Sequence, residues 1–348
     1  MKRIPSFQFR TVVLLLSVLL SSCRFLGIGS IPIDVLKSKY ANSESEFVQI
    51  GNVNLHYRDE GQGPAVILLH GVCASLHTWD DWTASLKGKY RIIRLDLPGH
   101  GLTGIDGDLS VLDPIQGVQL LEEFRKRLGL EKFYLVGNSM GGYISWNYSL
   151  SYPSRVEKMV LIDAAGYAQP LPELIAFGSH PLVRPVAKFS TPSFLVSRGI
   201  SQAYGDPSKL KDEVKERYID LSMREGNREA IAKIFQIARE KFLNPDISKR
   251  IAEVTTPTLV MWGTEDHWLK YEYFPYWKRD LKTRSSPFTK ARVIFRWRRF
   301  RIVRLGIWIL FFRAFIRIPR SSFFVNLRGG RSRVARFVSI LSVSWIRF

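Results

Sequence analysis

The stretch Lys132–Tyr143, with the sequence KFYLVGNSMGGY, constrains the fold more than any other part of the chain. Phe133–Val136 is a short apolar run typical of a buried strand, and small residues then open an apolar segment with helical potential. Gly137 and Gly141 flank Ser139, which suits a sharp and strained turn where a side chain would collide with its neighbours. The pattern predicts a strand, a turn that exposes the serine, and a helix.

Three further segments consist of an apolar run that leads into a distinctive loop. They are Ala65–Leu69 before His70-Gly71-Val72, Arg91–Leu95 before DLPGHG, and Thr258–Trp262 before Gly263-Thr264-Glu265-Asp266. In this order, HGVCASLHTW, DLPGHG, GNSMGG and WGTED resemble the α/β-hydrolase superfamily over about residues 45–282. The resemblance implies an α/β-hydrolase fold, which is a doubly wound, mostly parallel sheet with an inserted helical cap.

The order of apolar and amphipathic segments predicts the same organisation. Residues 45–165 alternate strand and helix patterns, as in a sheet covered on both faces, and begin with an expected antiparallel pair. Residues 166–254 show charged helical segments and no strand pattern, which predicts the cap. Residues 255–282 return to the pattern of the core.

The resemblance implies a role for several residues. Ser139 would be the nucleophile, and the backbone N–H groups of Met140 and Val72 would hold the oxyanion. Asp266 would orient the catalytic base, with Glu265 as the alternative acid. The residues that would support the loops around the serine are His70, Gly71, Gly137 and Gly141.

The family order of serine, acid and histidine also requires a histidine beyond Asp266. The six histidines are His56, His70, His77, His100, His180 and His267. His267 directly follows the acid that would have to orient it. His180, in the predicted cap, is the alternative base, because a triad is defined by geometry and not by chain order. We therefore expect the catalytic base to be missing.

The N-terminal residues have the pattern of an export signal. Basic residues precede the apolar run Thr11–Leu20. The last residue of this run begins the sequence Leu20-Ser21-Ser22-Cys23, which resembles a bacterial lipobox. The resemblance implies removal of residues 1–22 and a lipid on Cys23, with an ordinary cleaved signal as the alternative. The product would be an exported lipoprotein on a membrane, at the periplasmic or outer-membrane face. Residues 23–44 would be a linker, and Cys73 a packing residue without a disulfide partner.

Residues 283–348 differ in composition from the rest of the chain. They contain fifteen Arg, one Lys and no Asp or Glu, whereas the remainder carries 35 basic and 31 acidic residues. Reading Val293–Arg301 one base earlier permits Gly-His-Ile-Pro-Met-Glu-Lys-Ile-Pro, which resembles the closing motif of the family. We infer a single-base frameshift near Lys282-Thr283, which leaves the tail out of frame and not natively folded. Thr258–Trp262 would then be an unpaired edge strand in a poorly soluble, inactive product.

A basic, aromatic-rich tail can also bind anionic lipid or nucleic acid. Its longest uninterrupted apolar stretch, Leu305–Phe312, is too short to span a bilayer. An exported chain would rarely meet nucleic acid, so we expect the protein to bind a membrane and not a nucleic acid.

These features predict a serine hydrolase that cleaves a carboxylic ester or a similar carbonyl substrate through an acyl-enzyme. Five apolar cap residues favour a substrate with an apolar acyl or aromatic part, and the alternative is that each of them packs the cap onto the core: Phe177, Leu182, Phe189, Phe194 and Leu195. Within the enzymes, the alternatives are a carbon–carbon bond hydrolase of ring-fission products and an acyltransferase. A non-catalytic relic or a binding module on the same fold is the alternative of another class. The sequence has no metal-ligand cluster and no cofactor motif, so neither a metal nor a cofactor is expected.

Overall fold

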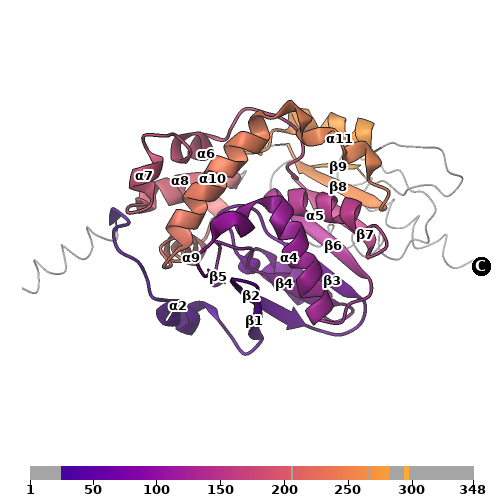
Figure 1. Ribbon diagram of the computed structural model, residues 1–348, viewed down its shortest axis with the longest axis horizontal. Coiled ribbons are helices and arrows are strands. Elements are labelled where there is room, and N and C mark those ends of the chain that lie inside the picture. The colour runs from indigo at the N-terminus through magenta and orange to yellow at the C-terminus, as the bar shows by residue number, and fades with distance from the viewer. Residues whose placement is uncertain (1–24, 205–206, 265, 282–293, 298–348) are drawn as a thin grey trace, which may run out of the picture.

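The computed structural model describes residues 25–204, 207–264, 266–281 and 294–297, and Figure 1 shows their arrangement. One sheet forms the centre, in the order β1-β2-β4-β3-β6-β7-β8-β9, with β5 paired to β2. The strands are β1 (Ser45–Ile50), β2 (Val53–Glu60), β3 (Ala65–Leu69), β4 (Arg91–Leu95), β5 (Gly104–Ile105), β6 (Phe133–Asn138), β7 (Val156–Ile162), β8 (Thr258–Gly263) and β9 (Ile294–Trp297).

The predicted doubly wound, mostly parallel sheet is confirmed. β1 pairs antiparallel with β2, and β2 with β4, whereas every neighbouring pair from β4 to β9 is parallel. All residues of β3 and β8 are buried. These strands read as continuous apolar runs because a central parallel strand is covered on both faces.

Helices cover the sheet, and a second group of helices is inserted between β7 and β8. The covering helices are α3 (Asp80–Leu86), α4 (Pro114–Arg127), α5 (Met140–Ser151) and α11 (Phe274–Asp280). The inserted cap contains α6 (Glu173–Gly178), α7 (Arg184–Ala187), α8 (Ser193–Ala203), α9 (Asp212–Ser222) and α10 (Asn227–Leu243). Figure 1 shows α6, α7, α8 and α10 grouped beside one another, away from β1 and β3.

Short 3-10 segments connect these elements. They are η1 (Leu76–Trp79), η2 (Leu109–Leu112), η3 (Pro207–Lys209), η4 (Pro245–Ser248), η5 (Ile251–Glu253) and η6 (Tyr271–Tyr273). The start of α4 shows how the sequence sets a boundary. Asp113 accepts a hydrogen bond from the Ile115 N–H at 2.9 Å, and Pro114 occupies the first turn, where its missing N–H costs nothing.

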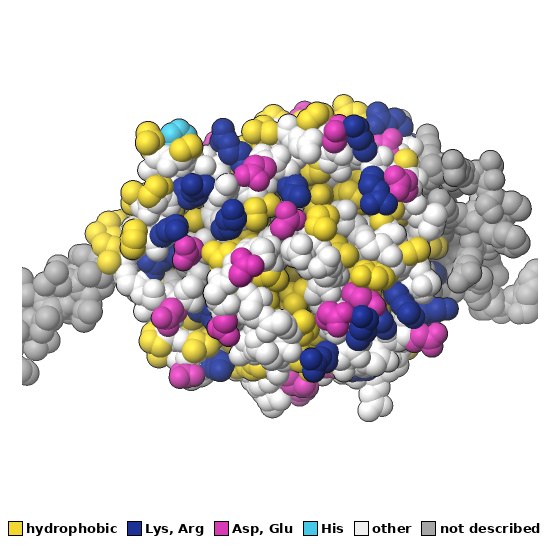
Figure 2. Space-filling view, viewed as in Figure 1, with side chains coloured by type: hydrophobic (Ala, Val, Ile, Leu, Met, Phe, Trp, Pro, Cys, Tyr) yellow, Lys and Arg dark blue, Asp and Glu magenta, His cyan; other side chains and the backbone are white. Residues whose placement is uncertain are grey.

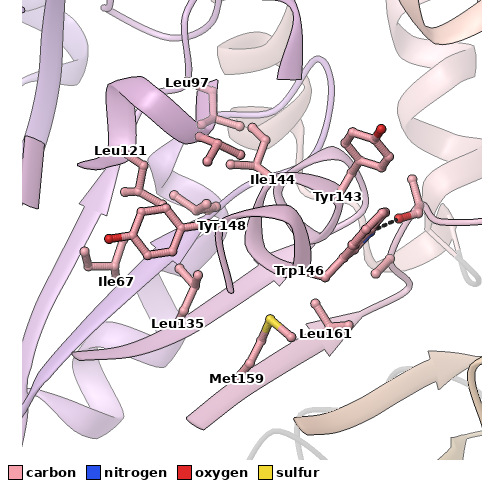
Figure 3. Packing of buried hydrophobic residues seen from close by; sticks show 14 of the residues in the cluster. Ile67, Leu97, Leu121, Leu135, Tyr143, Ile144, Trp146, Tyr148, Met159 and Leu161 are labelled. Carbon is pink, nitrogen blue, oxygen red and sulfur yellow. Dashed lines mark hydrogen bonds between the residues drawn. The ribbon is translucent and has the colours of Figure 1, made fainter. Parts of the chain in front are cut away.

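Helix α5 packs its aromatic side chains against the sheet (Figure 3). Trp146 lies against Met159 and Leu161 of β7, and its indole N–H donates to the Ala165 carbonyl at 3.0 Å. Tyr148 is fully buried and donates to the Glu122 carboxylate at 2.7 Å. Both rings therefore contribute apolar area while their polar atoms keep a hydrogen-bond partner.

Residues before β1 form a helix rather than the linker that the sequence predicted for residues 23–44. Helix α2 (Ile33–Tyr40) buries Leu36 in a cluster with Leu102 and Leu221. Leu221 belongs to α9 of the cap, and Leu102 lies in the loop after β4. The prediction was wrong because the partners of Leu36 lie far along the chain, where no local pattern reveals them.

Polar contacts fix α2 to the cap as well. The Lys39 ammonium lies 2.7 Å from the carboxylates of both Glu216 and Asp220 in α9. The Tyr40 hydroxyl donates to Asp220 at 2.7 Å. The segment before the sheet therefore joins the cap to the core.

Strand β8 is not the unpaired edge that the sequence predicted. β9 lies parallel to it, with Val260 opposite Ile294 and Gly263 opposite Trp297. Four residues of the Arg-rich tail are therefore part of the sheet. Backbone hydrogen bonds can complete an open edge without particular side chains, which is why a β-branched and aromatic segment can pair there whatever its reading frame.

Several predicted features lie outside the described residues: the export signal, Cys23, Glu265 and the remainder of the tail. Within the part of the chain that is described, no helix combines the length and the hydropathy needed to cross a bilayer.

Candidate active site

Ser139 lies in the turn between β6 and α5, as the sequence predicts. Its backbone has φ 51° and ψ −113°, a conformation that residues other than glycine rarely adopt. Its N–H donates to the Ile162 carbonyl at 3.1 Å, and its carbonyl accepts from the Ala165 N–H at 3.2 Å. The surrounding strands therefore hold the turn in its strained form.

The flanking glycines allow this close packing of backbone. A Cβ atom on Gly137 would lie 2.3 Å from the Gly141 carbonyl oxygen, and one on Gly141 would lie 2.3 Å from the Leu69 carbonyl oxygen. A Cβ on Gly71 would lie 3.1 Å from the Ser139 Cβ. The loop after β3 therefore passes directly beside the serine.

Val72 and Met140 lie on the two segments that meet at Ser139. Met140 is the first residue of α5, so its N–H belongs to the unsatisfied donors of a helix start. Among the hydrogen bonds of the described residues, neither the Val72 nor the Met140 N–H has an acceptor. Side chains of both residues line the same cavity as Ser139. Two backbone donors are thus available where an oxyanion would form.

A pocket at Ser139 lies between core and cap, and it comprises about 600 Å³ of space that is partly open to solvent. Its walls from the core are Val72, Leu112, Pro114, Met140, Tyr143, Ala165, Trp268 and Leu269, and its walls from the cap and η4 are Pro172, Ile175, Ile234, Ile237, Ala238, Lys241, Phe242 and Ile247. Lys241 is the one charged residue of this described lining, and its ammonium lies 3.3 Å from the Asp113 carboxylate. Such a cavity suits a largely apolar ligand.

The cap residues that the sequence placed at the pocket lie elsewhere. Phe177, Leu182, Phe189 and Phe194 are exposed to solvent, and none of them lines the cavity, nor does Leu195. Composition showed that the cap is apolar but not which face each residue occupies. Helix α6 illustrates the difference, because Ile175 faces the cavity whereas Phe177 is half exposed.

Asp266 follows β8, at the same edge of the sheet as Ser139. Its Oδ1 accepts hydrogen bonds from the N–H groups of Trp268 at 2.7 Å and Leu269 at 2.9 Å. Burial raises the pKa of Asp266 to about 6, although these two bonds and the nearby His267 favour the charged form. Its carboxylate keeps some solvent contact, but protein atoms surround it closely.

A second carboxyl group, which the sequence analysis missed, lies at the end of the neighbouring strand. Asp163 follows β7, is buried, and accepts a hydrogen bond from the Gly263 N–H at 2.6 Å. Burial first, and the Asp266 charge second, raise its pKa well above the ordinary value. The signal was present in the sequence, because Asp163 follows an apolar run as Asp96 and Asp266 do. Ser139, Asp163 and Asp266 thus follow three adjacent parallel strands.

No histidine of the described residues is hydrogen-bonded to Ser139. His70 accepts from the Leu97 N–H at 3.0 Å and donates to the Gly71 carbonyl, so both of its ring nitrogens are engaged. His180 is exposed, and its ring nitrogen accepts from the Leu182 N–H. It is not among the cavity-lining residues, so the structure does not place it as the alternative base.

The other described histidines have neighbours other than Ser139, although the buried Nε2 atoms of His56 and His100 have no hydrogen-bond partner among the described residues. His56 lies 2.7 Å from the Asp96 carboxylate in the buried core, and His100 lies 3.0 Å from the Pro98 carbonyl. His77 lies 3.1 Å from Ser75 Oγ, and His267 is exposed beside Asp266.

The described residues also show what the site does not contain. No group of His, Cys, Asp and Glu side chains among them could hold a metal ion. Cys73 follows Val72, and burial raises the pKa of its thiol to about 12, so a thiolate nucleophile is disfavoured at neutral pH.

Comparison with known proteins identifies the family. A model of the alpha/beta hydrolase fold matches residues 64–294. The chain therefore belongs to the α/β-hydrolase fold family, which its motifs and its sheet had indicated.

Several hydrolases are similar to this chain. A 2-hydroxy-6-oxo-6-phenylhexa-2,4-dienoate hydrolase of Comamonas testosteroni is 28% identical over 246 residues, which cover 66% of this chain and 82% of the relative. A 2-hydroxy-6-oxononadienedioate/2-hydroxy-6-oxononatrienedioate hydrolase of the same organism is 29% identical and covers 67% and 83%. The crystal structure of a meta-cleavage product hydrolase from Pseudomonas fluorescens shares the fold, with a TM-score of 0.65, 22% identity, and coverage of 79% and 98%.

The raised pKa of Asp266 predicts how stability depends on pH. An unfolded aspartate has a pKa of about 3.9, so between that value and 6 the folded chain holds a proton that the unfolded chain has released. The stability that the protonated Asp266 contributes is therefore fully present below about pH 4 and is lost as the pH rises through 6. We expect the free energy of unfolding to fall by about 2 kcal/mol from this group between pH 4 and pH 8.

The variant Asp266→Asn keeps the acceptor oxygen but cannot ionise, so its unfolding free energy in urea should fall less over the same range. Asp81→Asn, at an exposed position, is the matched control and should retain the full pH dependence. If the free energy of unfolding fell equally with pH in the wild type and in Asp266→Asn, the raised pKa of Asp266 would be contradicted.

Proposed function

We propose that this fold carries the site of a serine hydrolase, in which Ser139 attacks a carbonyl carbon. The observation that carries the proposal is the strained Ser139 turn at the wall of an apolar cavity. Attack would form an acyl-enzyme, and the Met140 and Val72 N–H groups would stabilise the oxyanion, as such donors do in acyl transfer. Asp266 would be the acid that orients the base, with buried Asp163 beside it.

The comparisons favour carbon–carbon bond hydrolysis over the ester hydrolysis that led the predictions from sequence. One Comamonas relative is named as the hydrolase of a dienoate that carries a phenyl group and a carboxylate, and the other as the hydrolase of a dienedioate or trienedioate, which carries two carboxylates. In this chain the apolar walls would accept the phenyl group. Lys241 would be the cation available to a carboxylate.

Ester hydrolysis remains the second candidate because of the charge of the cavity. The Lys241 ammonium is already paired with Asp113, and the other lining residues offer no positive charge. An apolar acyl ester would need no such charge. An acyltransferase would use the same acyl-enzyme with an acceptor other than water.

The two reactions can be separated with protein made from a gene whose reading frame is restored near codon 282. We expect hydrolysis of 2-hydroxy-6-oxo-6-phenylhexa-2,4-dienoate, with kcat/KM lowered about 10- to 100-fold by Lys241→Met because a charged hydrogen bond is lost. Hydrolysis of nitrophenyl butyrate by the same variant is the matched control and should change little. Hydrolysis of the nitrophenyl ester alone would favour the ester candidate.

We further propose that the chain as it stands is inactive. A serine hydroxyl is a weak nucleophile without an adjacent base, and no described histidine reaches Ser139. Loss of a triad member typically costs about 10⁴-fold or more in rate. The proposed frameshift accounts for both the missing histidine and the arginine-rich tail.

Labelling with a fluorophosphonate probe tests this proposal. We expect no labelling of the present chain, and labelling of the frame-restored protein that Ser139→Ala abolishes. Nucleotide sequence from the codon of Tyr271 to the stop should spell Gly-His-Ile-Pro in the frame one base earlier. Labelling of Ser139 in the present chain would show that another base serves it, and a frame without that motif would make the tail genuine.

We also propose that the chain is exported and carries a lipid on Cys23, on the basis of the basic residues, apolar run and Leu-Ser-Ser-Cys pattern at its N-terminus. Palmitate incorporated in living bacteria should then be lost in Cys23→Ser. Unchanged incorporation would contradict the anchor.

A further inference from the structure

Exposed hydrophobic side chains gather on one part of the cap and on the chain beside it, which we call the cap patch. Its members are Phe25, Leu26, Ile28, Phe177, Leu182, Val186, Phe189 and Phe194. Leu182 and Phe189 keep 81% and 74% of their surfaces exposed. Figure 2 shows hydrophobic side chains gathered at the left edge of the molecule, where the chain enters from residues 1–24.

The cap patch is a built surface that joins two distant parts of the sequence. The ring of Phe25 stacks on that of Phe194, with 6.1 Å between centroids. Ser190 Oγ donates to the Leu26 carbonyl at 2.7 Å, and Ile28 pairs with Ser190 across a β-bridge. The residues that follow the N-terminal apolar segment are therefore held against α7 and α8.

The position of Phe25 in the chain indicates what covers the cap patch. The apolar run Thr11–Leu20 ends five residues before Phe25, and Cys23 is two residues before it. A chain spans at most about 3.6 Å per residue, so Cys23 lies within about 7 Å of Phe25 and Leu20 within about 18 Å. A bilayer that receives either the apolar run or a lipid on Cys23 would therefore lie close to Phe25, a member of the cap patch.

The charge around the cap patch suits a membrane. Neither residues 1–33 nor residues 174–205 contain Asp or Glu, and the second segment carries Arg184, Lys188 and Arg198, of which Lys188 pairs with Glu229 and Arg198 with Glu173. Exposed aromatic and aliphatic side chains flanked by basic residues are typical of surfaces that lie in the headgroup region of a bilayer. Contiguous exposed apolar surface of this kind marks an interaction site.

We propose that the cap patch rests on a lipid bilayer, with Leu182 and Phe189 inserted at the boundary between headgroups and acyl chains. The inference goes beyond the proposed hydrolase activity and does not depend on it. It also gives α6 two roles, because Ile175 lines the cavity and Phe177 belongs to the cap patch. A cavity for an apolar substrate would thus lie one short helix away from the membrane surface.

A fluorophore that reports contact with lipid tests the proposal. The full chain is bound to phosphatidylcholine vesicles that contain a nitroxide on the lipid acyl chain, and vesicle-bound protein is isolated by flotation. Bimane is attached to Leu182→Cys or Phe189→Cys, with the unsubstituted chain as the background from Cys23 and Cys73. Leu243→Cys is the matched control, since Leu243 is 57% exposed but lies outside the cap patch.

We expect quenching at positions 182 and 189 to exceed that at 243 by about twofold or more, because residues of an interfacial surface lie among the lipids. Phosphatidylcholine carries no net charge, so these vesicles limit electrostatic binding of the Arg-rich tail. The measurement also compares quenching between labelled positions, which binding through the tail alone would not make different. Equal quenching at the three positions, or no protein in the floating fraction, would refute the proposal. A different result would assign the cap patch to a second copy of the chain. In that case the nitroxide lipid would not quench the bimane fluorescence, and quenching of bimane by aqueous iodide would decrease as the protein concentration rises.

Discussion

Close packing of backbone around the Ser139 turn is the constraint on which the rest of the structure depends. A side chain at Gly137 or Gly141 would occupy the space of a neighbouring carbonyl group, so β6, α5 and β3 can approach only with glycine there. Hydrogen bonds from this turn to Ile162 and Ala165 then link it to β7 and to the first residues of the cap insertion. The position of the serine is therefore set by the sheet and not by the cap or by a substrate.

The two acidic side chains of the site accept hydrogen bonds from backbone N–H groups but form no ion pair with another described residue. Asp163 and Asp266 follow adjacent strands, and burial raises the pKa of both, while the charge of Asp266 raises that of Asp163 further. A triad of this family places a histidine against such a carboxyl group, and its protonated ring would stabilise the charged form. Burial disfavours the ionised form of both carboxyl groups, and a protonated histidine ring beside them would offset that cost.

Local patterns were sufficient for the parallel strands up to β8, the order of these elements and the serine turn, because each depends on residues close together in the sequence, but they missed β9. They failed for α2, where Leu36 depends on contacts with Leu102 and Leu221. They failed likewise for the orientation of the cap, since Phe177 and Ile175 lie on one short helix but face different surroundings. Asp163 was missed because its significance comes from the strand beside it.

The division of the sequence explains how a chain can retain this fold and lose its chemistry. The glycine turn, the N–H groups of Val72 and Met140 and both carboxyl groups precede residue 282, and so do the described cap helices. Beyond that point the fold requires one strand at the sheet edge, and β9 supplies backbone for it through Ile294–Trp297. A strand can be replaced by many sequences because its pairing uses backbone groups, whereas a catalytic base must be one residue type at one place. A shift of reading frame in this region would therefore remove catalysis before it removed the architecture.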